Sequence, residues 1–121
     1  MAAIMLVEDD EGLREMLKSS LLKNKFQVIE ATNGRDAINK FKAILIELVI
    51  TDLLMPEQDG IGLIIELRKI KPDLKIIAIS GGGKAGPGNY LSIAQTLGAN
   101  AIFAKPFSLN LFIDKVNELI N

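Results

Sequence analysis

Short apolar runs alternate along the chain with segments whose apolar residues recur at helical spacing. Five runs rich in Ile and Val are predicted strands, and the near-continuous hydrophobicity of most of them indicates strands covered on both faces. They are residues 3–7 (AIMLV), 26–30 (FQVIE), 47–51 (ELVIT), 75–79 (KIIAI) and 101–104 (AIFA). The run at 26–30 alternates between apolar and polar residues, so we expect it at an edge of the sheet.

An amphipathic helix is predicted after each of these strands. Asp10 and Glu11 suit the start of the first helix, Pro72 ends the third, Gly98 caps the end of the fourth and Ser108 caps the start of the fifth. The expected helix faces, in chain order, are Leu13, Met16, Leu17 and Leu21; Ala37, Ile38, Phe41 and Leu45; Ile61, Ile64, Ile65 and Arg68; Tyr90, Ile93, Ala94 and Leu97; and Leu109, Phe112, Ile113, Val116 and Ile120.

This alternation predicts an α/β fold of the (βα)5 type, a doubly wound parallel sheet in three layers. We favour the flavodoxin-like strand order 2-1-3-4-5, because it makes the first and third strands neighbours. The length of 121 residues predicts one domain over residues 1–121.

Composition excludes several classes of function. The net charge of -1 offers no basic surface, so neither direct nucleic-acid binding nor membrane binding is expected. The absence of cysteine and histidine excludes disulfides, thiolate zinc sites and Ser-His chemistry, and a phosphohistidine could come only from a partner. Together with the lack of a signal-like N-terminal segment, this favours the cytoplasm.

Polar residues stand at the downstream ends of four predicted strands: Asp9, Asp52, Ser80 and Lys105. The carboxyl ends of parallel strands meet at one edge of the sheet, where α/β folds bind their ligands. We therefore expect these side chains in one pocket.

Glu8 and Asp9 are predicted to lie beside Asp52. Three neighbouring carboxylates repel one another, so they either retain a proton or bind a cation, and a few converging oxygens suit Mg2+, or Mn2+ in its place. Acids at strand ends can instead cap the next helix. We favour that simpler interpretation for Asp10 and Glu11, and metal binding for Asp9 and Asp52.

Asp52 could also act as a nucleophile that accepts a phosphoryl group. The Lys105 ammonium, placed before Pro106, could neutralise phosphate charge, and the Ser80 hydroxyl could donate to a phosphoryl oxygen or serve only as a turn residue. The run GGGKAGPG at residues 81–88 lacks the G-K-[ST] ending of a nucleotide-binding loop. We expect it to be a mobile loop at the rim of the pocket.

Four motifs in this order closely resemble the receiver domain of bacterial two-component response regulators: VEDD at 7–10, D-L-x-M-P-x-x-D-G at 52–60, Ser80, and K-P-F at 105–107. The resemblance implies a phosphorylation-activated switch in a phosphorelay. The phosphoryl donor would be a sensor histidine kinase or a histidine phosphotransfer protein, and the target a downstream protein or a fused output domain. Catalysis would be limited to Mg2+-dependent self-phosphorylation and autodephosphorylation, and a homodimer is possible.

The resemblance also implies roles for individual residues around the metal. Asp52 resembles the phosphoacceptor, Glu8 and Asp9 the acidic pair with Asp9 as a direct metal ligand, and the backbone carbonyl of Leu54 a further ligand. Lys105 resembles the phosphate-binding lysine.

A second group of residues resembles the switch. Ser80 corresponds to the switch hydroxyl, and the output surface would span roughly residues 88–120. Ile102 stands where the family usually has an aromatic residue, whereas Phe103 falls on the opposite face of the strand.

Two alternatives remain. Phosphatases of the haloacid dehalogenase type use a similar residue set, but they need a second acid two residues after the nucleophile, where this chain has Leu54. A receiver-like interaction module that is never phosphorylated is the other alternative.

Overall fold

A computed structural model describes residues 2–53, 60–80, 92 and 95–120 of the chain. Its five parallel strands lie in the order β2-β1-β3-β4-β5, which confirms the predicted topology. The strands are β1 (Ala3–Val7), β2 (Gln27–Ala31), β3 (Leu48–Asp52), β4 (Lys75–Ser80) and β5 (Ala101–Ala104). β2 and β3 are each shifted one residue downstream of the prediction, and β4 is one residue longer. Asp52 and Ser80 are therefore the last residues of their strands.

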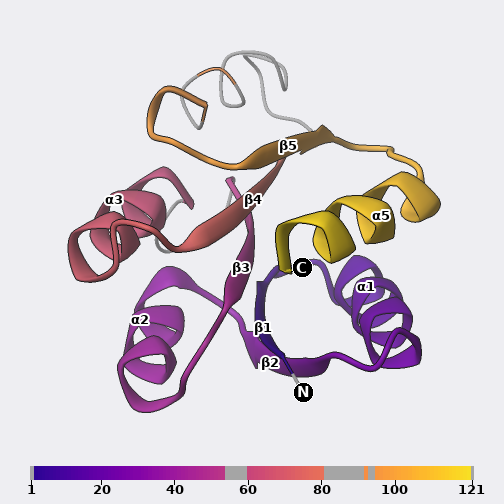
Figure 1. The fold of residues 1–121 in the computed structure, drawn as a ribbon, viewed down its shortest axis with the longest axis horizontal. Helices are drawn as coiled ribbons and strands as arrows, with labels where there is room; N and C mark the ends of the chain where they lie inside the picture. Colours follow the sequence, from indigo (N-terminus) through magenta and orange to yellow (C-terminus); the bar gives the residue numbers. More distant parts are fainter. Residues whose placement is uncertain (1, 54–59, 81–91, 93–94, 121) are drawn as a thin grey trace.

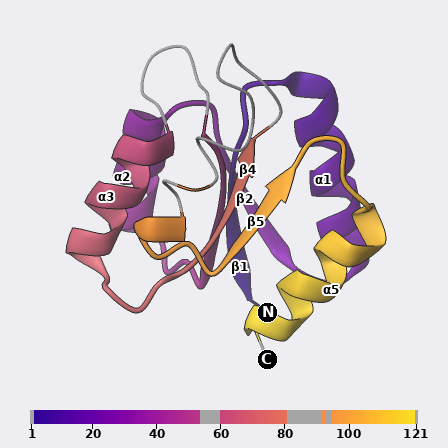
Figure 2. The same ribbon diagram turned by 90° about the horizontal axis from the view of Figure 1, so that it is seen from above.

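Helices cover both faces of the sheet, so the predicted three layers are present (Figures 1 and 2). α1 (Glu11–Lys23) and α5 (Leu109–Ile120) lie on one face, and α2 (Gly34–Ala43) and α3 (Gly60–Ile70) lie on the other. The predicted fourth helix falls mostly outside the described residues, as does the glycine-rich run at 81–88. Gly98 has the positive φ of 92° expected of a C-terminal cap, and its N–H donates to the Gln95 carbonyl.

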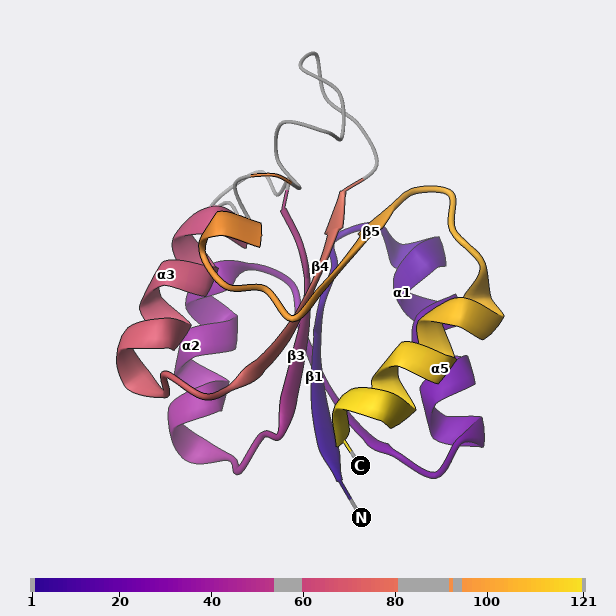
Figure 3. The ribbon, with the colours of Figure 1, turned by 45° about the horizontal axis from the view of Figure 1, so that its top comes forward.

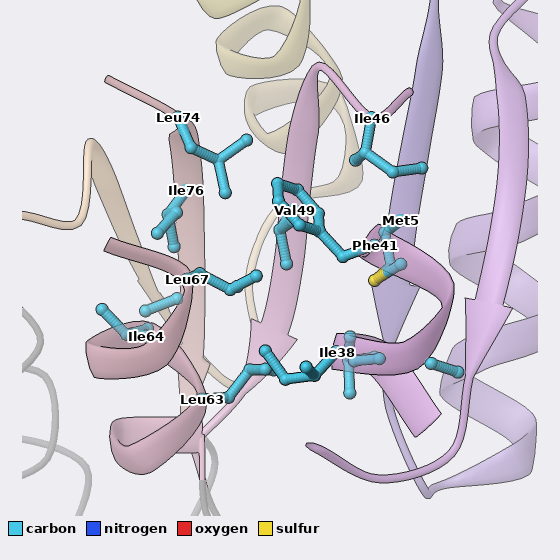
Figure 4. Close-up of a cluster of buried hydrophobic side chains, with 14 of the residues drawn as sticks. Met5, Ile38, Phe41, Ile46, Val49, Leu63, Ile64, Leu67, Leu74 and Ile76 are labelled. Atoms are coloured by element: carbon cyan, nitrogen blue, oxygen red, sulfur yellow. The ribbon is translucent and has the colours of Figure 1, made fainter. Parts of the chain in front are cut away.

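Side chains that alternate along the strands build two separate cores. Met5 and Val49 pack with α2 and α3, as Figure 4 shows, whereas Ile4 and Leu6 pack with α1 and α5. The period of two residues along β1 places these neighbours on opposite faces of the sheet. A strand buried on both sides has no polar face, which accounts for the continuous apolar runs.

Three of the predicted helix faces were partly wrong. In α1, Met16 is 50% exposed, whereas Leu17 and Leu21 are buried. Leu45 lies beyond the end of α2 and is 81% exposed, because the chain is already extended at Ile44. α3 turns Leu63, Ile64 and Leu67 inward and leaves Ile65 exposed. Arg68 lies outside the buried stripe and donates to the carbonyls of Pro72, Leu74 and Gly98.

The predicted N-terminal caps are confirmed. Asp10 Oδ1 accepts the N–H of Leu13 at 3.1 Å, with Glu11 in the first turn of α1. Ser108 Oγ accepts the N–H of Leu111 at 3.2 Å. These bonds satisfy amide groups that a helix start would otherwise leave unpaired. Within the described part of the chain, no helix combines the length and apolar character needed to cross a membrane.

Candidate functional site

The carboxyl ends of the strands lie along one edge of the sheet, which faces upward in Figure 3. Glu8 follows β1, Asp52 ends β3, Ser80 ends β4 and Lys105 follows β5. The strand register places Asp52 beside Ile79 and Ser80 beside Ala104, which keeps the four strand ends level with one another. The strand ends therefore meet at the edge of the sheet where the sequence predicted them.

Three carboxylates form the centre of this site. Glu8, Asp9 and Asp52 each present an oxygen, and these oxygens all lie within 4.8 Å of one another. Glu8 and Asp52 are buried, whereas Asp9 is exposed. The cluster therefore opens to solvent on the side of Asp9.

The Lys105 ammonium pairs with the two buried acids. Its Nζ lies 3.0 Å from Asp52 Oδ2 and 3.2 Å from Glu8 Oε1. The Lys105 N–H donates to the Ser80 carbonyl at 2.9 Å, which extends the pairing of β4 and β5 by one residue. This bond fixes the start of the Lys105 side chain at the edge of the acidic cluster.

Burial and mutual charge change the ionisation of this group. Burial, together with the neighbouring Asp52, raises the pKa of Glu8 to about 7 despite the opposing effects of the Asp10 N–H and the Lys105 charge. Burial also lowers the pKa of Lys105, but its hydrogen bonds and attraction to Asp52 and Glu8 outweigh that effect and raise the pKa overall. Lys105 is therefore charged at neutral pH, while the metal-free Glu8 carboxyl holds its proton more tightly than a solvent-exposed glutamate does.

Ser80 supplies a hydroxyl with unused bonding capacity. The residue is fully buried, and its Oγ has no hydrogen-bond partner among the residues that the structure describes. An unpaired buried hydroxyl costs about 1–3 kcal/mol. Such a group is available to donate to an oxygen that enters the pocket.

Gly60 packs directly against the main chain of Asp52, a contact that the sequence did not single out. A Cβ at this position would lie 2.2 Å from the Asp52 carbonyl oxygen and 2.8 Å from Leu53 Cα. The Gly60 N–H also donates to the Leu53 carbonyl at 3.0 Å. The glycine of the D-G pair in the motif was the available signal, since glycine permits close backbone approach.

Arg14 is the second residue whose contacts were missed. Its Nη1 donates to the Glu8 carbonyl at 2.8 Å, and its Nε lies 3.3 Å from Glu30 Oε1. The only sequence signal is its place in the second turn of the first helix, within reach of the preceding strand end.

The remaining predicted site residues are placed as follows. Leu54 lies outside the described residues. Ile102 is 37% exposed, whereas Phe103 packs on the other face of β5 with ring centroids 5.3 Å from Phe107 and 5.6 Å from Phe112. The two neighbours do face opposite sides, and their roles in switching stay predictions.

A groove of about 420 Å3 adjoins the acidic cluster between α1 and the segment that joins β5 to α5. Its apolar lining comes from Leu13, Met16, Pro106, Phe107 and Leu109, and Lys105 and Asp10 also line it. A partner seated there would lie next to the Lys105 side chain.

Comparison with known proteins agrees with this geometry. The chain matches the response regulator receiver domain family over residues 4–117. It is 34% identical over 119 residues to the chemotaxis protein CheY of Bacillus subtilis (strain 168), covering 98% of this chain and 97% of that protein. It is 35% identical over 117 residues to CheY of Thermotoga maritima, covering 96% and 95%.

A solved structure of the response regulator protein TrrA from Thermotoga maritima, in complex with Mg(2+)-BeF, has a TM-score of 0.86 and 33% sequence identity. That match covers 98% of this chain and 99% of TrrA. The chain belongs to the receiver domain family of response regulators.

Proposed function

We propose that this receiver domain is a phosphorylation-activated switch in which Asp52 accepts a phosphoryl group from a phosphohistidine on a partner protein. One observation supports the proposal most strongly. The Glu8, Asp9 and Asp52 carboxylates and the Lys105 ammonium lie together at one edge of the sheet. Because these 121 residues include no histidine, the donor imidazole must lie outside them.

The residues fit a divalent cation such as Mg2+ or Mn2+. Three carboxylate oxygens within 4.8 Å offer the hard ligands these ions prefer, leaving room for water and phosphate oxygens. Glu8, Asp9 and Asp52 would hold the ion, with the Leu54 carbonyl as a further predicted ligand. A bound ion would neutralise charge on the phosphoryl oxygens. The Mg(2+)-BeF complex of TrrA supports this assignment.

The transfer step uses the Asp52 carboxylate as the nucleophile. One oxygen of Asp52 forms a bond to phosphorus, while the P–N bond of the donor breaks and its electron pair passes to the imidazole nitrogen. The other ring nitrogen of the donor carries a proton, so the imidazole leaves uncharged. Lys105, 3.0 Å from Asp52 Oδ2, pairs with the incoming phosphoryl oxygens, and transfer depends mainly on such positioning and charge.

The switch begins at Ser80. The phosphoryl group adds about 1.5 to 2 negative charges, and the buried Ser80 hydroxyl can donate to one of its oxygens. Ser80 ends β4 beside Ala104 of β5, so this new bond acts on the strand pair that carries exposed Ile102. The predicted output surface, roughly residues 88–120, is the face on which a downstream protein or a fused output domain would bind.

The upstream partner is a sensor histidine kinase or a histidine phosphotransfer protein. The apolar groove beside Lys105 offers such a partner a surface next to the phosphoacceptor. Occupation of this groove would bring a donor imidazole close to Asp52.

The test is to incubate the purified protein with Mg2+ and a small acyl phosphate and to measure the intact mass. We expect a gain of one phosphoryl group that Asp52→Asn abolishes. Asp10→Asn is the matched control, because it removes a neighbouring charge while asparagine still caps α1. A folded protein that gains no mass and binds no Mg2+ by calorimetry would favour the interaction module instead.

A further inference from the structure

The Arg14 side chain connects three parts of the fold. It starts in α1, its Nη1 donates to the Glu8 carbonyl at the end of β1, and its Nε lies 3.3 Å from Glu30 Oε1 on β2. Only 17% of this side chain is exposed. A guanidinium can make two such contacts at once because its donors are held in a rigid fork. Because the Arg14 side chain is mostly buried and has two partners, its contacts differ from those of an exposed surface ion pair.

The turn that Arg14 holds carries the acidic pair. Within the turn, the Asp10 N–H donates to Glu8 Oε2 at 3.1 Å, and the Leu13 N–H donates to Asp10 Oδ1 at 3.1 Å. Both bonds are local to the turn and the start of α1. The Arg14 contact, in contrast, ties the turn to Glu30 on the neighbouring strand. The direction in which exposed Asp9 presents its carboxylate depends on this backbone.

The positive charge of Arg14 and its hydrogen bond to the Glu8 carbonyl would have opposite effects on cation binding. A positive charge beside a cation site would by itself weaken cation binding. Glu30 offsets part of that charge, since its single carboxylate pairs with Arg14 and also with Lys18, whose Nζ lies 3.0 Å from Glu30 Oε2. The contribution of Arg14 that favours the site is its hydrogen bond to the Glu8 carbonyl, 2.8 Å long.

We infer that Arg14 is a positioning residue: by holding the Glu8 carbonyl against β2, it fixes the turn that aims the Glu8 and Asp9 carboxylates at the cation. The inference rests on the proposed Mg2+ site and assigns Arg14 no contact with the ion or the phosphoryl group. Residues that orient metal ligands commonly change metal affinity by about 10-fold to 100-fold when they are replaced.

The test measures the Mg2+ dissociation constant of the folded protein by calorimetry. Arg14→Gln is expected to raise the constant about tenfold. Phosphorylation by an acyl phosphate should need correspondingly more Mg2+ and return to the wild-type rate once Mg2+ is saturating. Arg14→Lys keeps the charge but lacks the fork that spans Glu8 and Glu30, so it should weaken binding in the same direction.

Lys18→Gln is the matched control. It removes an equal charge from the same helix and the same Glu30 partner, but Lys18 has no contact with Glu8 among the bonds described here. We expect its Mg2+ affinity to equal that of the wild type.

The outcomes separate the two proposals. Wild-type or tighter Mg2+ binding by Arg14→Gln would mean that the residue acts through charge or fold stability alone, and would overturn the inference while leaving the proposed function intact. If Arg14→Gln does not fold, unchanged affinity in Arg14→Lys overturns the inference and weakened affinity supports it. Failure of the wild type to bind Mg2+ would remove both the proposed site and the role of Arg14.

Discussion

Lys105 Nζ lies 3.0 Å from Asp52 Oδ2, although the two residues are 53 positions apart in the chain. The Lys105 ammonium pairs with the same carboxylates that would bind a metal cation. An ion bound at the proposed Mg2+ site would therefore compete with Lys105 for the same two buried carboxylates.

Replacing Lys105 by Met should tighten Mg2+ binding for this reason. We expect a gain of roughly 1 kcal/mol, about fivefold in the dissociation constant, which is modest because the site is partly open to solvent. Calorimetry at fixed ionic strength measures this change. Equal or weaker binding in Lys105→Met would show that the ammonium does not compete with the ion.

Stability without metal should depend on pH through Glu8. Its pKa is raised from 4.5 to about 7 by burial, so the folded protein holds this proton more tightly than the unfolded chain. The resulting stabilisation is complete below about pH 4.5 and is lost as the pH rises through about 7, with a slope of at most about 1.4 kcal/mol per pH unit. Lys105 remains charged over this range and adds no slope.

Urea unfolding in a chelator at several pH values measures the effect. Glu8→Gln mimics the protonated acid, so its stability should lack this part of the pH dependence. Parallel curves for the wild type and Glu8→Gln would contradict the assignment. Saturating Mg2+ should restore wild-type stability at high pH, since a ligand that binds only the folded state stabilises it.

Removing the buried hydroxyls of Ser80 and Thr51 should change the free energy of unfolding in opposite directions. Ser80→Ala deletes a hydroxyl that has no partner among the described residues, and it should keep or raise the free energy of unfolding, by up to about 1 kcal/mol. Thr51→Val removes a hydroxyl that donates to the Asp52 carbonyl at 2.9 Å and should lower it by about 1 kcal/mol. Urea unfolding compares the two.

The same Ser80→Ala protein should lose the structural response to phosphorylation. Amide exchange of β5 with and without a beryllofluoride phosphate mimic would show this loss. An undiminished response would assign the switch to another group.

Gly60→Ala should destabilise the fold, because its Cβ would lie 2.2 Å from the Asp52 carbonyl oxygen. Displacing this backbone should cost about 1–3 kcal/mol or more and also impair phosphorylation. Gly12→Ala is the control: its Cβ would meet nothing closer than 3.6 Å, so the substitution should be neutral or stabilising. Thermal unfolding and the phosphorylation assay distinguish the two variants.

The sequence predicted the topology because buried parallel strands are unambiguous in this chain. β1 and β4 contain almost no polar residue before their ends, so the polar residues that follow mark the carboxyl edge of the sheet. The convergence of Glu8, Asp9, Asp52 and Lys105 follows from that topology alone. Their predicted roles still depend on the experiments above.

Other features could not be predicted from spacing. α3 is apolar around much of its circumference, so the pattern did not decide whether Leu63 or Ile65 faces the core. The Arg14 contact with the Glu8 carbonyl depends on side-chain reach across a turn. The absence of a partner for Ser80 Oγ among the described residues is a property of packing, which no sequence pattern records.

The unequal burial of the three carboxylates governs how an ion would exchange. Asp9 faces water while Glu8 and Asp52 belong to the interior, so an ion can leave on the Asp9 side without disturbing the packing behind it. Adding a chelator should therefore strip the metal and leave the circular dichroism of the protein unchanged, unlike a structural zinc domain that unfolds when its metal is removed. The fraction of the protein able to accept a phosphoryl group would then depend on the surrounding Mg2+ concentration.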